Sequence, residues 1–210
     1  MRRLLLLAAF ILVFGNSNAQ NNIDKADSLR LSIVKELNQK QIKDFFCLLQ
    51  TSPSSPIVIE SEDTNSHQTI TNFTGFVFWK ENSKSFIQKF DSWGKFNVQE
   101  IVGFEGFDLV SKNLNKIKNE SVLPYMIKKG KEYQTLVSPN QYQYGFFFNL
   151  GSMVFEKQFQ VDGLIKNDYI DRPEMENMNY TKNINLELLK LFNLCQVAGK
   201  SLETKKLIRI

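Results

Sequence analysis

Residues 141–161 read QYQYGFFFNLGSMVFEKQFQV, with large apolar side chains alternating with other residues on both sides of a central Gly-Ser pair. Before that pair, one parity holds Tyr142, Tyr144, Phe146, Phe148 and Leu150. The other parity is polar or glycine except at Phe147. Alternation with a period of two is typical of a strand that buries one face. The stretch therefore predicts a β-hairpin that turns at Gly151-Ser152 and returns through Met153, Phe155, Phe159 and Val161.

Residues 73–103 predict a second antiparallel unit, because apolar side chains again alternate between two faces. A turn at Asn82-Ser83 would place Trp79 opposite Phe86, which is a favourable cross-strand pair. Neither turn residue is the glycine that two-residue hairpin turns prefer. We expect the large aromatic residues of both units to be buried, namely Trp79, Phe86, Phe146, Phe148 and Phe155.

Three segments carry apolar residues at helical spacing. Residues 22–50 contain two such stripes that are out of phase, so we expect helix with a kink or break near residues 38–41. Residues 107–117 predict a second helix, and residues 184–198 predict a third that ends with Gly199 at its C′ position. Aromatic strand faces need an apolar cover, which amphipathic helices provide. We therefore expect an α+β fold, in which an antiparallel β-sheet of meander and hairpins carries amphipathic helices on one face.

The first residues have the anatomy of a secretory signal peptide. Arg2 and Arg3 precede an unbroken apolar run over residues 4–14, and Asn18-Ala19 offers a small residue at a cleavage point. The run is about half of the roughly 20 residues that a membrane-spanning helix needs. We expect residues 1–19 to be a cleaved signal peptide and residues 20–210 to form a single globular domain, periplasmic or secreted. An uncleaved anchor and a buried helix are the alternatives.

The charge of the chain gives no reason to expect nucleic acid as a partner. Two of the 26 Lys and Arg residues lie in the predicted signal peptide, so the excess over the 22 Asp and Glu residues falls from +4 to +2. Proteins that bind nucleic acid usually need a stronger basic surface. The 18 phenylalanines argue against disorder, because disordered chains lack such aromatic surface.

The chain contains two cysteines, Cys47 and Cys195, and both lie in segments predicted to be helical. In an oxidising compartment two cysteines can pair, so we expect either a Cys47–Cys195 disulfide or two buried free thiols. Neither belongs to a C-x-x-C pattern, which argues against dithiol redox chemistry and a thiolate zinc site.

The sequence offers no recognisable catalytic or metal-binding motif. His67 is the single histidine and lies in a polar segment, which argues against a zinc hydrolase site and against a Ser-His-Asp triad. Residues 162–176 are rich in acidic side chains, but their spacing does not match a calcium-binding EF-hand loop. We therefore predict no catalytic, cofactor-binding or metal-binding residues, and no cofactor.

Tyr142 and Tyr144, at the start of the hairpin, are the candidate ligand-facing aromatic residues, although a stripe of this kind can also be sheet core. We expect a non-enzymatic domain that binds a small ligand or a protein partner. The alternative is a small hydrolase that uses two carboxylates on an extracytoplasmic substrate such as a glycan. Two acidic side chains in one cleft would favour the hydrolase, and a closed or apolar cleft would favour binding.

Overall fold

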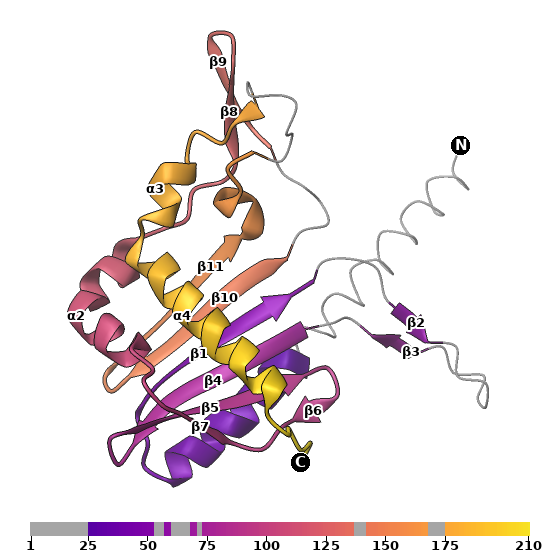
Figure 1. Cartoon of the computed structure of the whole chain (residues 1–210), viewed down its shortest axis with the longest axis vertical. Coiled ribbons are helices and arrows are strands. Elements are labelled where there is room, and N and C mark those ends of the chain that lie inside the picture. Colours follow the sequence, from indigo (N-terminus) through magenta and orange to yellow (C-terminus); the bar gives the residue numbers. More distant parts are fainter. Residues whose placement is uncertain (1–24, 53–56, 60–67, 71–72, 137–141, 168–174) are drawn as a thin grey trace, which may run out of the picture.

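The structure is a computed structural model that describes residues 25–52, 57–59, 68–70, 73–136, 142–167 and 175–210. The predicted signal peptide, the cleavage point after Ala19 and His67 lie outside these residues. The chain has the predicted α+β architecture, in which helices pack on an antiparallel sheet (Figure 1).

The main sheet has seven strands in the order β11-β10-β1-β4-β5-β6, with β7 also paired to β5. All of its pairings are antiparallel. The strands are β1 (Asp44–Thr51), β4 (Phe73–Glu81), β5 (Lys84–Asp91), β6 (Gly94–Lys95), β7 (Gln99–Ile101), β10 (Gln143–Leu150) and β11 (Met153–Gln160). Two small hairpins stand apart from this sheet, β2 (Ile57–Ile59) with β3 (Gln68–Ile70) and β8 (Met126–Lys129) with β9 (Glu132–Thr135).

Both predicted hairpins of the main sheet are confirmed. Trp79 lies opposite Phe86 in the β4–β5 pair, and the two rings stack with centroids 5.7 Å apart. The turn residues Asn82 and Ser83 both have positive φ angles, of 50° and 64°. A two-residue turn with this backbone matches the right-handed twist of the flanking strands, and asparagine tolerates it better than most residues. The second hairpin joins β10 to β11 through Gly151.

The predicted helix over residues 22–50 is wrong in its second half. A helix covers residues 25–39, and the chain then enters β1, the strand between β4 and β10. Phe45, Phe46, Cys47 and Leu48 are all buried, so this strand has no polar face. A continuous apolar run of this length fits a strand buried on both faces as well as it fits a helix segment, and periodicity alone does not separate the two.

Helices lie on both faces of the sheet, not only on one. On the front face of Figure 1, α2 (Gly106–Asn119) and α4 (Glu187–Ser201) pack against a cluster that includes Phe46, Phe78 and Phe146. On the back face, helix 25–39 packs through Ile33 and Leu37 on Phe45, Val77 and Trp79. The alternating residues of β1 and β4 divide between these two clusters, which is why both faces need a cover.

Of the aromatic residues predicted to be buried, Trp79, Phe146 and Phe148 are. Phe86 and Phe155 are partly buried and pack against the edges of the two clusters.

Of the two states expected for the cysteines, the structure has two buried free thiols and not the Cys47–Cys195 disulfide. Cys47 belongs to the back cluster, beneath helix 25–39, whereas Cys195 belongs to the front cluster on α4. The sheet lies between the two clusters. The prediction assumed that Cys47 sat on a helix flanking α4, and its position within a strand removes that arrangement.

The prediction that Gly199 follows the end of the last helix is wrong, because Gly199 lies within α4. A Cβ atom at this position would come within 3.0 Å of the Phe76 ring on β4. Glycine therefore allows close approach of the helix to the sheet, and α4 continues to Ser201.

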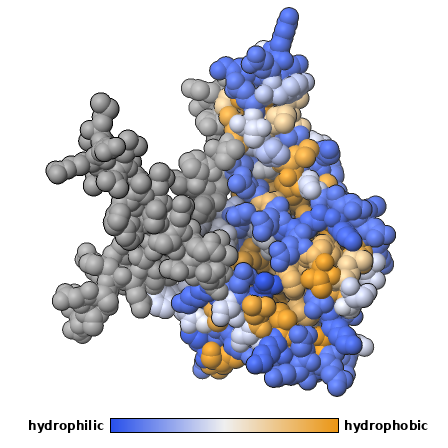
Figure 2. Space-filling model, turned by 180° about the vertical axis from the view of Figure 1, so that it is seen from behind, coloured by the Kyte–Doolittle hydropathy of each residue, from blue (hydrophilic) through white to orange (hydrophobic). Residues whose placement is uncertain are grey.

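Two buried asparagines hold the region between the sheet and the projecting β8–β9 hairpin. Asn183, on α3 (Tyr180–Ile184), accepts a bond from Leu123 N and donates to Leu123 O and Gly163 O. Asn177 accepts a bond from Met126 N at the base of β8. Figure 2 shows mostly hydrophilic residues on the projecting hairpin, which these asparagines anchor to the body.

Candidate functional site

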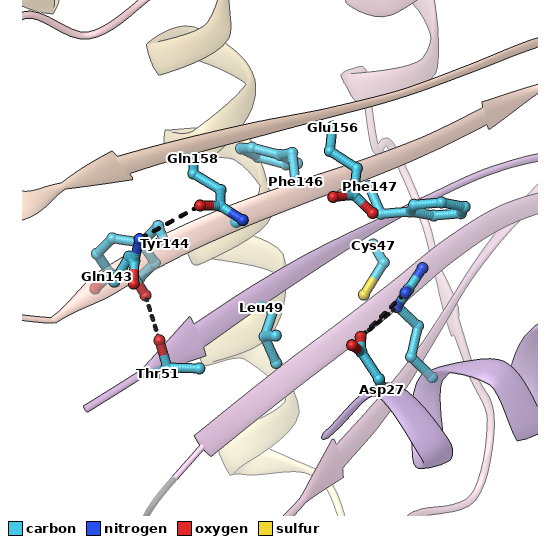
Figure 3. A pocket seen from close by; sticks show the side chains of 12 residues that line it. Asp27, Cys47, Leu49, Thr51, Gln143, Tyr144, Phe146, Phe147, Glu156 and Gln158 are labelled. Atoms are coloured by element: carbon cyan, nitrogen blue, oxygen red, sulfur yellow. Dashed lines mark hydrogen bonds and ion pairs between the residues drawn. The ribbon is translucent and has the colours of Figure 1, made fainter. Parts of the chain in front are cut away.

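Among the described residues, the helix over residues 25–39 covers the centre of the back face of the sheet and leaves the side towards β10 and β11 uncovered. Helix 25–39 packs over β1, β4 and β5, and the back-facing positions of β10 and β11 are largely polar. A hollow of about 170 Å³ lies beside the first turns of the helix. It is lined by Asp27, Arg30, Cys47, Leu49, Thr51, Gln143, Tyr144, Gly145, Phe146, Phe147, Glu156 and Gln158, most of which Figure 3 labels. We call this hollow the groove.

A glycine creates the floor of the groove. Leu49 on β1 pairs with Gly75 of β4 on one side and with Gly145 of β10 on the other. The ring of Phe90 fills the space above Gly75, so that an added Cβ would lie only 2.0 Å from the ring. At Gly145 the nearest atoms to an added Cβ are Lys157 O at 3.9 Å and Gln158 Cγ at 4.0 Å. The same cross-strand row is therefore filled by a ring at Gly75, whereas at Gly145 an added Cβ would make ordinary van der Waals contacts at the edge of the groove.

An arginine and an aspartate form one wall. Arg30 donates from Nε and Nη2 to Asp27 Oδ1, at 3.2 and 3.0 Å. Its guanidinium carbon lies 4.3 Å from the centre of the Phe147 ring, in cation–π geometry. The Arg30 side chain is 14% exposed and that of Asp27 is 45% exposed. Stacking and the ion pair together hold the guanidinium in place at the rim.

Glu156 contributes a second carboxylate to the opposite side. It pairs with Phe147 across the β10–β11 ladder, and the two side chains lie side by side in Figure 3. Glu156 is exposed and makes no ion pair within the described part of the chain. With Arg30 offsetting Asp27, the groove carries a formal charge of −1.

The far end of the groove is lined by uncharged polar groups. Thr51 donates to Gln143 O at 3.3 Å, and Gln143 Nε2 approaches Gln158 Oε1 at 3.5 Å. A second hollow of about 220 Å³ lies beyond these glutamines and reaches Val122, Pro124, Gln160 and Gly163. Gln143 and Gln158 line both hollows, so they form a wall common to the two.

Cys47 lies beneath the groove but is not poised as a nucleophile. Its side chain is 1% exposed. Burial raises the pKa of its thiol to about 12, against the opposing effect of the Arg30 guanidinium and with small contributions from Asp27 and Glu156. The thiolate is the reactive form of cysteine, and desolvation of this kind suppresses it.

The two predicted ligand-facing tyrosines have different surroundings. Tyr144 is 9% exposed, and its ring packs on Phe192 of α4 with centroids 4.6 Å apart. Burial, and then the neighbouring Tyr142, raises the pKa of the Tyr144 hydroxyl. Tyr142 is 49% exposed and directly precedes Gln143. A role for Tyr142 in ligand contact stays a prediction, whereas the Tyr144 ring serves the front core.

The remaining groove residues were not predicted as a site. Asp27 and Arg30 lie in a segment whose apolar spacing predicted a helix. No feature of the sequence indicates that these two residues lie near β10. The polar parity of residues 141–149 did signal an uncovered strand face, and Phe147 was its single exception. That exception is the ring on which Arg30 stacks.

The acidic segment does not assemble a metal site among the residues that the structure describes. Asp162 is buried and Glu176 pairs with Lys166 at 3.6 Å, while residues 168–174 lie outside the described part. No group of three or more His, Cys, Asp or Glu side chains that could hold a metal ion occurs in the described ranges.

Comparison with known proteins identifies no relative. No protein-family model matches the chain, and neither the curated proteins nor the solved structures include a match. Across the described residues, no helix has both the length and the apolar character needed to cross a membrane.

Proposed function

We propose that this chain is an exported, non-enzymatic binding domain that holds a small polar ligand in the groove. The observation that carries the proposal is the open space above Gly145. Glycine in the interior of a strand weakens the strand, and it often marks a place where a ligand approaches closely. Phe90 removes that weakness at Gly75 by packing over it, whereas no ring packs over Gly145 among the described residues and Gly145 lines the groove.

The groove walls also have the character of a binding site. Small-ligand sites combine a concave shape with a few well-placed polar groups. Here Arg30 is oriented by Asp27 and by the Phe147 ring, and Gln143 and Gln158 present carboxamides at the far end. At about 170 Å³ the groove is smaller than the roughly 300–1,000 Å³ typical of drug-sized ligands, so it suits a ligand about the size of one sugar ring or one amino acid.

The test fills the groove and asks whether binding is lost. Saturation-transfer NMR on the purified protein would use three mixtures: monosaccharides, free amino acids and nucleosides. We expect transfer to at least one mixture with the natural protein, and none with Gly145→Val. Gln134→Val adds the same side chain on the exposed strand β9 and should behave like the natural protein. No transfer to any mixture, or equal transfer to Gly145→Val, would overturn the proposal.

A carboxylate-dependent hydrolase is the second candidate, because Asp27 and Glu156 both line the groove. Its general acid would need a carboxyl group in an apolar environment. Asp27 is instead bonded to Arg30 and 45% exposed, and Glu156 is exposed, so the groove supports binding better than hydrolysis. Chromatography of an oligosaccharide after incubation separates the two. An intact oligosaccharide supports binding, and cleavage that Glu156→Gln abolishes supports the hydrolase.

Export is part of the proposal and rests on the predicted signal peptide at residues 1–19. N-terminal sequencing of protein recovered outside the cytoplasm should give a chain that starts at Gln20 or within a few residues of it. An exported product that retains Met1 and fractionates with the membrane would contradict cleavage.

A further inference from the structure

The groove and the second hollow together are longer than a single-ring ligand. Along β10, the groove runs from Phe147 to Gln143, which is roughly 13 Å for four residues of a strand. The second hollow begins at the same Gln143–Gln158 wall and extends to Gly163 and Pro124. A ligand that used both hollows would be an elongated molecule that crosses the two glutamines.

The backbone of β10 beneath the groove is closed to an extended peptide. Peptides that bind as added strands need free backbone groups at a sheet edge. The groove lies instead on the face of the sheet, where β10 is paired with β1 on one side and with β11 on the other. An amphipathic helix laid in the groove would bury the charged side chains of Asp27, Arg30 and Glu156, which line it. Recognition must therefore come from side chains.

The available side chains are planar groups with several hydrogen-bonding atoms. A carboxamide has two N–H donors and an acceptor oxygen, and a guanidinium has five N–H donors. The Gln158 oxygen faces Gln143 Nε2, which leaves the Gln158 amino group for a ligand. Arg30 uses Nε and one Nη2 donor on Asp27 and keeps its other donors. Such groups match neighbouring hydroxyls, which both donate and accept.

The charge of the groove lining further restricts the chemical class of the ligand. Arg30 offsets Asp27, and Glu156 has no counter-ion within the described residues. An anionic ligand would meet this uncompensated carboxylate, and like charges at close range are unfavourable. A neutral, hydroxyl-rich chain fits the groove best.

We infer that the ligand is a neutral oligosaccharide of two or three residues that crosses the Gln143–Gln158 wall, with one ring above Gly145. This inference rests on the proposed binding function and names its ligand class. The proposed saccharide site differs from a general small-molecule site because the ligand must occupy both hollows. It also assigns a specificity role to Gln158, which reaches the ligand from the common wall.

The experiment is calorimetric titration of the purified protein with five probes: maltotriose, cellotriose, chitotriose, trigalacturonate and trialanine. At least one neutral trisaccharide should bind, and at least tenfold more tightly than its own monosaccharide. Trigalacturonate and trialanine should not bind. Gln158→Ala should weaken the trisaccharide by roughly five- to tenfold, the effect of one or two lost hydrogen bonds. Gln134→Ala on β9 is the matched control and should leave the affinity unchanged.

The outcomes separate the ligand class from the proposed function. Groove-dependent binding of trialanine, amino acids or nucleosides, without any neutral trisaccharide, would overturn the saccharide and leave the binding function standing. Tighter binding of trigalacturonate than of the neutral trisaccharides would contradict the argument from the groove charge. The ligand would then not be a neutral oligosaccharide. Equal affinity for a monosaccharide and its trisaccharide would overturn the role of the second hollow. If no probe or mixture binds, both proposals fail.

Discussion

Replacing Gly145 by valine should stabilise this protein, although replacing the equivalent Gly75 by alanine should destabilise it. Both glycines lie next to Leu49 in one cross-strand row. An added Cβ at Gly145 finds its nearest neighbours at 3.9 and 4.0 Å, which is ordinary van der Waals contact. An added Cβ at Gly75 lies 2.0 Å from the buried Phe90 ring. The two variants therefore test whether the groove is genuine open space.

The magnitudes follow from these contacts. Gly145→Val gains β-propensity, which spans about 1 kcal/mol in host proteins, and its Cβ makes only ordinary van der Waals contacts. We expect a gain of about 0.5–1 kcal/mol in the free energy of unfolding, or a rise in Tm of roughly 1–4 °C for a chain of this size. Gly75→Ala must displace the Phe90 ring, and overpacking of this kind costs about 1–3 kcal/mol.

Urea denaturation followed by tryptophan fluorescence measures both values, since Trp79 is buried in the back cluster. A loss of more than about 1 kcal/mol in Gly145→Val would mean that the space above Gly145 is filled in solution, and the groove would be lost as a candidate site. A neutral Gly75→Ala would show that Phe90 is not packed as the structure has it. Gly145→Val should also lose ligand binding, so that stability and function change in opposite directions at this residue.

Three further variants and one pH dependence test the rest of the fold. Phe146→Ala removes a fully buried ring from the front cluster and should cost about 3–5 kcal/mol by denaturant titration; an unchanged midpoint would contradict its place in the core. Asn183→Ala leaves the Leu123 N–H and C=O groups without their side-chain partner, removes one of the two side-chain donors to Gly163 O, and should cost about 2–4 kcal/mol. Asn185→Ala, at an exposed neighbour, should be close to neutral. Burial raises the pKa of the Cys47 thiol to about 12 from 9.0, so the unfolded chain loses this proton first as pH rises. The stability that this thiol contributes is therefore complete below pH 9 and falls by up to about 4 kcal/mol on approaching pH 12, and Cys47→Ala should show a shallower alkaline decline in Tm than the natural protein.

Strand patterns predicted most of this fold because β10 and β11 alternate in apolar character and because turn signals delimit the strands of both hairpins. The register Trp79 opposite Phe86 followed from the position of a turn, and the turn adopted the required backbone with Asn82 and Ser83 in place of glycine. The segment that failed was β1. Its four consecutive buried residues carry no alternation, because a central strand between two covered faces does not need a polar side. The out-of-phase stripes indicated a break near residues 38–41, where the helix does end. They could not reveal that the residues beyond the break form a strand, since that signal lay in the sheet that later strands build.

The groove was harder to predict because its residues come together only through that misassigned strand. Once residues 44–51 form a strand between β4 and β10, Leu49 lies between Gly75 and Gly145, and helix 25–39 brings Arg30 over Phe147. Read as a helix, the same residues would have placed neither Leu49 beside a glycine nor Arg30 near β10. The sequence nevertheless held one local clue. A strand that alternates polar residues with a single phenylalanine, and contains a glycine at the same parity, is poorly designed for a packed core and well designed for a face that leaves room for another molecule.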